Sequence, residues 1–158
     1  MEETIKLIEK VTEFAINPDV KSENKIKDLK QLLVSIYAKF LTIEKLDDDT
    51  NYKESYSLSY GEVKENVLKN FPDHGYYNLV FDSHKIIYKE CKIKPEVDVD
   101  LGDPIDDICD ILKDLLEVKW RYENYSKENA NWSFMFLMKN HSEEHLVNLL
   151  KYLKDLEE

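Results

Sequence analysis

Apolar residues recur three or four positions apart along most of the chain, which is the spacing that places side chains on one face of a helix. This pattern predicts a first helix over residues 3 to 16. Asn17 and Pro18 end it, because proline disfavours the helical conformation in the residue that precedes it. The pattern resumes over residues 22 to 41, where we expect a second helix.

A third helix is expected to begin after Ser59 and to end before Pro72. Ser59 and Glu62 have the N-cap and N3 spacing of a capping box, which satisfies two free backbone N–H groups at a helix start. Residues 72–102 contain prolines, glycines and apolar residues without a clean period, so they indicate either short extended pieces or one irregular helix. Residues 96–100 alternate as an edge strand does, and a solvated linker remains an equal alternative.

Two more helices follow the irregular segment. In the fourth predicted helix, residues 103–125, Asp103 is suited to the N-cap and Pro104 to the first helical position. A polar break at residues 126–127 precedes a final predicted helix over residues 128–156. The fold class is therefore expected to be all-α.

The predicted elements fit one architecture, a single-domain bundle of about five helices. This domain would span residues 1–158 and include the irregular central segment 72–102.

Carboxylates recur along the fourth predicted helix at steps of three, one, three, four and three residues. They are Asp103, Asp106, Asp107, Asp110, Asp114 and Glu117, and we call them the acidic stripe. At 100° per residue they fall within an arc of roughly 100°, and apolar residues occupy the opposite side. The spacing predicts an amphipathic helix whose outer face is nearly all negative.

The charge of the chain is unevenly distributed. There are 22 lysines and arginines against 33 aspartates and glutamates, for a net charge of −11, and residues 96–117 alone carry nine acids and one base. A surface of this sign repels nucleic acid and anionic lipid, and it favours basic protein partners or cations. An acidic surface that serves solubility alone remains an alternative.

The chain start has neither a basic segment nor a continuous apolar stretch, so we expect no signal peptide and no transmembrane helix. The expected location is the cytoplasm. Cys91 and Cys109 are not in a C-x-x-C spacing and are expected to be reduced, with Cys109 in the core.

The C-terminal third carries a resemblance. Residues 106–115 read D-D-I-C-D-I-L-K-D-L, and Trp132, Phe136, a turn over 141–145 and the run 146–153 follow in order. These landmarks resemble an uncharacterised bacterial family of domains of unknown function (DUF 5063-like), whose members have D-D-L-A-D-I-Y-R-D-L and H-L-V-x-A-L-R-x-L runs. The resemblance implies an all-helical fold and a bacterial source.

Outside this third, the likeness is limited to helices with a tyrosine-bearing loop near Tyr76 and Tyr77. The chain has Ser142 and Glu143 where the family has Trp-Gly, so any role of that tryptophan is absent or moved. The family has no established activity that the resemblance would imply.

The most specific motif is H-x-x-E-H at His141, Glu144 and His145, the spelling of inverted zinc peptidases. On a helix the two histidines could share a zinc ion, and Glu144 could activate a water. Such peptidases need a larger domain and a third ligand well downstream, whereas thirteen residues follow His145. The motif therefore predicts one histidine packed inward and one solvated, with no metal site and no cofactor.

The sequence contains few other candidate catalytic, metal-binding or contact residues. The acidic stripe lacks the looped or facing ligands of Ca²⁺ and Mg²⁺ sites, and residues 47–49 do not form an EF-hand. Cys91 has neighbouring lysines but no histidine in a defined relation to it. Tyr76 and Tyr77 are candidate contact residues, because tyrosine is favoured at protein interfaces.

We predict a non-catalytic protein-binding module that engages a basic protein partner through the acidic stripe, Tyr76 and Tyr77, as an immunity or antitoxin-like protein would. An alternative is an enzyme or metal protein that uses His141, His145, Glu144 and a stripe aspartate. A structural or regulatory helical domain is a third possibility. The oligomeric state is left open.

The docking hypothesis makes one specific prediction about the acidic stripe. Reversal of Asp106, Asp110 and Asp114 to lysine should leave the helix folded and abolish capture of the partner.

Overall fold

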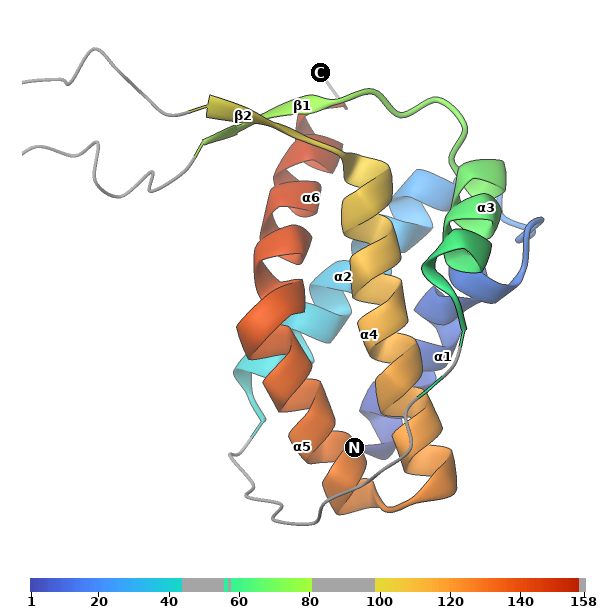
Figure 1. Cartoon of the computed structure of the whole chain (residues 1–158), viewed down its shortest axis with the longest axis vertical. Coiled ribbons are helices and arrows are strands. Elements are labelled where there is room, and N and C mark those ends of the chain that lie inside the picture. The colour runs from blue at the N-terminus through green and yellow to red at the C-terminus, as the bar shows by residue number, and fades with distance from the viewer. Residues whose placement is uncertain (44–55, 57, 81–98, 157–158) are drawn as a thin grey trace, which may run out of the picture.

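The computed structural model describes residues 1–43, 56, 58–80 and 99–156, and Figure 1 shows them as a helical bundle crossed at one end by two short strands. The elements are α1 (Glu2–Ile16), α2 (Lys25–Leu41), α3 (Tyr60–Asn70), β1 (Tyr77–Val80), β2 (Val99–Gly102), α4 (Pro104–Asn124), α5 (Lys127–Leu137), the π-helical turn η2 (Met138–Ser142) and α6 (Glu143–Asp155). The prediction of an all-α bundle is confirmed. Among the described residues, no helix has both the length and the apolar character needed to cross a membrane.

The starts of α3 and α4 have the side-chain caps predicted from the sequence. Ser59 and Glu62 form the expected capping box at α3. Asp103 accepts hydrogen bonds from the backbone N–H groups of Ile105, at 2.9 Å, and Asp106, and Pro104 occupies the first turn of α4. Each cap satisfies backbone groups that the helix itself leaves unpaired.

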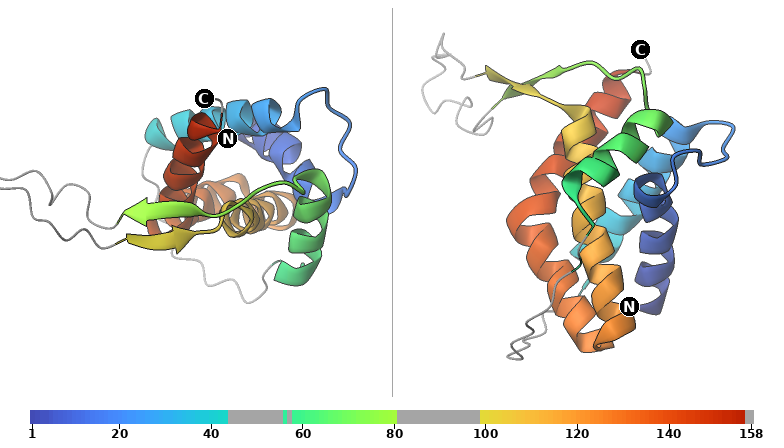
Figure 2. Two further views of the ribbon diagram at one scale, coloured as in Figure 1. Left: turned by 90° about the horizontal axis from the view of Figure 1, so that it is seen from above. Right: turned by 45° about the vertical axis from the view of Figure 1, so that its right-hand side comes forward.

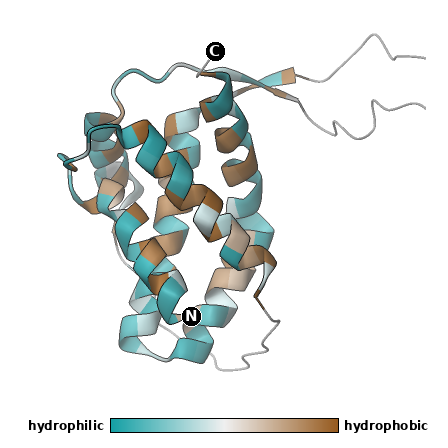
Figure 3. Ribbon diagram, turned by 180° about the vertical axis from the view of Figure 1, so that it is seen from behind, coloured by the Kyte–Doolittle hydropathy of each residue, from teal (hydrophilic) through white to brown (hydrophobic). Residues whose placement is uncertain are grey.

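Helix α4 lies at the centre of the bundle and contacts α1, α3, α5 and α6. Figure 2 shows these helices arranged around it when the bundle is seen end on. Figure 3 shows apolar and polar positions interspersed along the helices, and the apolar positions form the core. Its largest fully buried side chains include Phe14, Phe71, Phe134, Ile8, Leu29, Leu33, Ile36, Ile108, Ile111 and Leu112.

Cys109 is fully buried in this core as a free thiol, as predicted. Burial raises the pKa of the Cys109 thiol to about 12, because a buried thiolate would lose its hydration.

The final helix differs from the single regular helix predicted over residues 128–156. Residues of α5, η2 and α6 are helical throughout this range up to Asp155, but Met138–Ser142 form a π-helical turn. Within this turn, the side-chain amide of Asn140 donates a hydrogen bond to the Phe136 carbonyl at 2.7 Å. The prediction of one regular helix did not include this wider turn, in which backbone hydrogen bonds run from residue i to i+5.

The irregular central segment contains an antiparallel ladder in which Tyr77 pairs with Gly102 and Val80 with Val99. The extended alternative for the segment is therefore correct over β1 and β2. Cys91 and most of the segment lie outside the described residues, as do residues 47–49. The predictions made for them remain predictions.

Candidate metal centre

The acidic stripe is covered by other elements. The side chains of Asp107, Asp110, Asp114 and Glu117 are 8%, 22%, 17% and 17% exposed. The prediction of a nearly all-negative outer face is therefore wrong for this part of α4. The predicted helix is confirmed, but the polar side of α4 faces polar groups of neighbouring elements instead of water.

His145 of α6 is oriented by Asp107 of α4. The Nδ1 nitrogen of His145 lies 2.7 Å from Oδ1 of Asp107, and this carboxylate is almost completely buried. The second oxygen of Asp107 accepts a hydrogen bond from the Tyr77 hydroxyl at 2.6 Å. The carboxylate thus holds the ring of His145 with Nδ1 as a donor and leaves Nε2 free to act as an acceptor.

His141 is oriented in the same way one helical turn earlier. Its Nδ1 nitrogen lies 2.9 Å from Oδ2 of Asp114, and the Ser142 hydroxyl donates to the same oxygen. His141 and Ser142 are adjacent in sequence yet reach one carboxylate. Both belong to the π-helical turn, in which consecutive side chains diverge by a smaller angle than in an α-helix.

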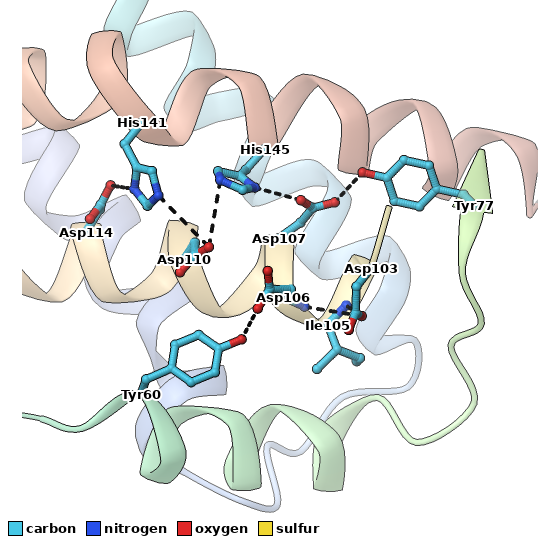
Figure 4. Close-up of polar contacts among 10 residues, drawn as sticks. All are labelled: Tyr60, Tyr77, Asp103, Ile105, Asp106, Asp107, Asp110, Asp114, His141 and His145. Carbon is cyan, nitrogen blue, oxygen red and sulfur yellow. Dashed lines mark hydrogen bonds and ion pairs between the residues drawn. The ribbon is translucent and has the colours of Figure 1, made fainter. Parts of the chain in front are cut away.

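The two histidines converge on Asp110. The Nε2 nitrogen of His145 lies 3.7 Å from Oδ2 of Asp110, and that of His141 lies 4.0 Å from the same oxygen. One ligand atom from each of the three residues lies within 4.8 Å of the other two. Figure 4 shows both rings directed toward Asp110, with Asp107 and Asp114 on their far sides.

The electrostatics of the centre follow from burial and from these contacts. The hydrogen bond to Asp107 raises the pKa of His145, and burial opposes that shift. Burial raises the pKa of Asp110, with a further contribution from Asp106, while the two histidines act in the opposite direction. The carboxylates therefore stabilise positive charge between α4 and α6.

The remaining acidic stripe residues have structural contacts. Asp103 caps α4, and Asp106 accepts a hydrogen bond from the Tyr60 hydroxyl. Glu117 accepts hydrogen bonds from Arg121 Nε at 2.6 Å and from the backbone N–H of Tyr56 at 2.7 Å.

Three further candidates from the sequence occupy different surroundings. Tyr76 is 70% exposed, whereas its neighbour Tyr77 turns inward to Asp107. Glu144 is exposed and is not part of the group formed by Asp110, His141 and His145.

The alternative of a metal protein, as stated from the sequence, combined the two histidines with Glu144 and an unspecified stripe aspartate. In the structure Asp110, 31 residues before His141 in the chain, lies beside the histidine pair, and Glu144 does not. The signal for Asp110 was its four-residue spacing from Asp114, which matches that of His141 and His145 on a facing helix.

Comparison with known proteins identifies the fold alone. No known family's sequence profile matches the chain, and no curated protein matches it. The fold is similar to the crystal structure of protein BF1032 from Bacteroides fragilis, with a TM-score of 0.68 and 16% identity over 99% of this chain and 91% of that chain. The resemblance to the bacterial domain-of-unknown-function family stays a prediction.

Proposed function

We propose that this protein binds a divalent transition-metal ion between α4 and α6, with Asp110, His141 and His145 as ligands. The observation that carries the proposal is the orientation of both imidazoles. Each Nδ1 is bound to a carboxylate, at 2.7 Å and 2.9 Å, and each Nε2 faces Asp110. Histidine ligands of metals characteristically donate their second ring N–H to a carboxylate or carbonyl in this way.

The spacing suits a metal ion. Zinc binds imidazole nitrogen and carboxylate oxygen at about 2.0–2.2 Å, so two ligands in tetrahedral geometry are about 3.4 Å apart. The separations of 3.7 Å and 4.0 Å from Asp110 to the two nitrogens exceed that value by a few tenths of an ångström, and the three ligand atoms all lie within 4.8 Å of one another. Side-chain rotations would bring the three atoms to the separations that a metal ion requires.

The donor types select the class of metal. Two imidazoles and one carboxylate suit Zn²⁺, Fe²⁺ and related ions, whereas Ca²⁺ and Mg²⁺ prefer oxygen ligands throughout. The side chain of His141 is 47% exposed, so the centre is reached from solvent. Three protein ligands leave a coordination position for water or another small ligand.

This proposal replaces the sequence-based expectation of no metal and no cofactor. Docking of a basic partner on the acidic stripe stays a separate prediction. Four of the stripe carboxylates are partly buried and contact residues of the same chain. These observations favour metal binding over the docking of a basic partner.

Zinc titration of the protein, purified without a histidine tag, tests the proposal. Calorimetry should give one Zn²⁺ per chain for the wild type. His141→Ala should abolish this binding, because it removes one of the three proposed ligands. The variant should stay folded, since this side chain is half-exposed and its loss leaves the core intact. Asp110→Asn should weaken binding by removing the anionic ligand.

Glu123→Gln is the matched control, because it removes an exposed carboxylate from the same helix, where Glu123 pairs only loosely with Lys119 at 3.6 Å. It should bind zinc as the wild type does. If the wild type takes up no zinc, or if His141→Ala binds it equally well, the proposal is wrong and the histidines only join α6 to α4.

A further inference from the structure

The β1–β2 ladder is connected to the proposed metal centre through a single carboxylate. Asp107 accepts a hydrogen bond from Tyr77 of β1 on one oxygen and from His145 of α6 on the other, at 2.6 Å and 2.7 Å. Figure 4 shows this chain of contacts running from Tyr77 through Asp107 to His145 and on to Asp110. The strand pair and a proposed metal ligand thus share one hydrogen-bonded group.

The backbone of β2 is adapted to this contact. Tyr77 pairs across the ladder with Gly102, and its ring lies directly against the Cα of that glycine. Any Cβ at position 102 would overlap the atoms of the Tyr77 ring. Glycine is therefore needed for the ring to cross β2 and bring its hydroxyl to the start of α4.

Tyr77 is the inward anchor of a strand pair that is otherwise largely exposed. Its ring contacts that of Tyr152 on α6, with centroids 5.4 Å apart. In contrast, Val99 and Leu101 of β2 are 53% and 68% exposed. Loss of the Tyr77 contact would therefore remove much of what holds the described strands to the bundle.

We propose that Tyr77 is a positioning residue for the metal centre, and that metal binding in turn holds the β1–β2 ladder against α4 and α6. This inference rests on the proposed metal-binding function. A metal ion on Nε2 of His145 fixes the imidazole ring, and the fixed ring holds Asp107 in the position that Tyr77 needs. The ladder and the metal site are then coupled.

Such coupling is reciprocal. If metal binding stabilises the docked ladder, the docked ladder must increase metal affinity by the same factor. Replacement of groups that orient metal-bound histidines typically lowers affinity about 10- to 100-fold. Asp107 contacts the proposed ligand His145 directly, whereas Tyr77 contacts only Asp107 in this chain of hydrogen bonds. We therefore expect the loss of metal affinity to lie at the lower end of this range, about 10-fold.

The decisive comparison is Tyr77→Phe against Tyr76→Phe. The first variant removes the hydroxyl that reaches Asp107, and the second removes the hydroxyl of the adjacent, exposed tyrosine. Zinc affinity should fall about 10-fold in Tyr77→Phe and stay unchanged in Tyr76→Phe. Equal affinities in both variants would overturn the inference and leave the proposed function standing.

Hydrogen exchange distinguishes a positioning role of the Tyr77 hydroxyl from a purely structural one, because a purely structural hydroxyl would not make the exchange rates depend on zinc. In the wild type, added Zn²⁺ should slow exchange of the backbone amides of β1 and β2. In Tyr77→Phe, zinc at saturating concentration should leave the exchange of these amides nearly unchanged. If Tyr77→Phe does not fold, the effect of zinc on exchange in the wild type still tests the coupling.

The outcomes separate the two claims. Wild-type protein that binds zinc without slower exchange in β1 and β2 contradicts the coupling alone. Wild-type protein that binds no zinc contradicts the proposed function, and the coupling with it.

Discussion

The Nδ1 nitrogen of His145 lies 2.7 Å from Oδ1 of Asp107, a residue that precedes it by 38 positions in the chain. This contact joins α6 to α4 through Asp107, whose side chain is 8% exposed. A buried carboxylate without partners would be strongly destabilising. The pairing therefore explains how the central helix of the bundle can carry so many acids on one face.

Replacement of Asp107 by asparagine should weaken both the fold and the metal centre. The amide lacks the charge that the carboxylate presents to His145, and it cannot accept on both side-chain atoms from Tyr77 and His145. We expect a loss of about 1–3 kcal/mol in the free energy of unfolding and a fall in zinc affinity of about 10- to 100-fold. Urea denaturation with a chelator present and zinc titration measure the two effects, with Glu123→Gln as control. Unchanged stability and affinity would contradict the described role of Asp107.

Reversal of Asp106, Asp110 and Asp114 to lysine should disrupt the bundle. The docking hypothesis expects this variant to stay folded, but the structure leads to the opposite expectation. Asp106 accepts from Tyr60, and Asp114 accepts from His141. Lysines there would remove these acceptors and place like charges beside the histidines. Thermal unfolding followed by circular dichroism should show a large loss of stability, and a wild-type melting temperature would show that the acidic stripe is in fact solvated.

Replacement of Gly102 by alanine should displace Tyr77. The added methyl group overlaps the tyrosine ring, and overpacking of this kind costs about 1–3 kcal/mol. Zinc affinity should fall together with stability, because the displaced ring no longer reaches Asp107. Gly61→Ala in α3 is the matched control, since among the described residues nothing outside the neighbouring residues and backbone of its own helix lies within 4 Å of the added Cβ. It should be neutral or stabilising, and equal effects of both changes on stability would argue against the close approach of Tyr77.

The cap of α4 gives a prediction that is independent of the metal. Asp103→Ala should lower the free energy of unfolding by about 1 kcal/mol, because two backbone N–H groups lose their acceptor. Asp103→Asn should retain most of that stability, since asparagine caps helices equally well. Chemical denaturation of the two variants distinguishes a cap from a purely electrostatic role for Asp103.

Local features of the fold were predictable because their signals lie within a few residues. The capping box of Ser59 and Glu62 and the cap at Asp103 depend on contacts two or three positions apart. The apolar periodicity of α2 and α4 likewise defines each helix without reference to its neighbours. Such signals are readable from one sequence.

The site was harder to predict because its contacts join distant segments. A helical pattern separates a polar arc from an apolar one, but it does not say whether the polar arc faces water or polar partners. His141 and His145 contact aspartates 27 and 38 positions earlier. The π-helical turn that brings His141 and Ser142 to one carboxylate was not part of the helix predicted from the sequence.

Anomalous diffraction from crystals of the untagged protein soaked in Zn²⁺ tests the central claim most directly, because it locates the ion without reference to affinity. We expect one strong peak between the Nε2 nitrogens of His141 and His145 and Oδ2 of Asp110. A fully ordered crystal with no peak at that position, or with zinc bound elsewhere on the surface instead, would contradict it.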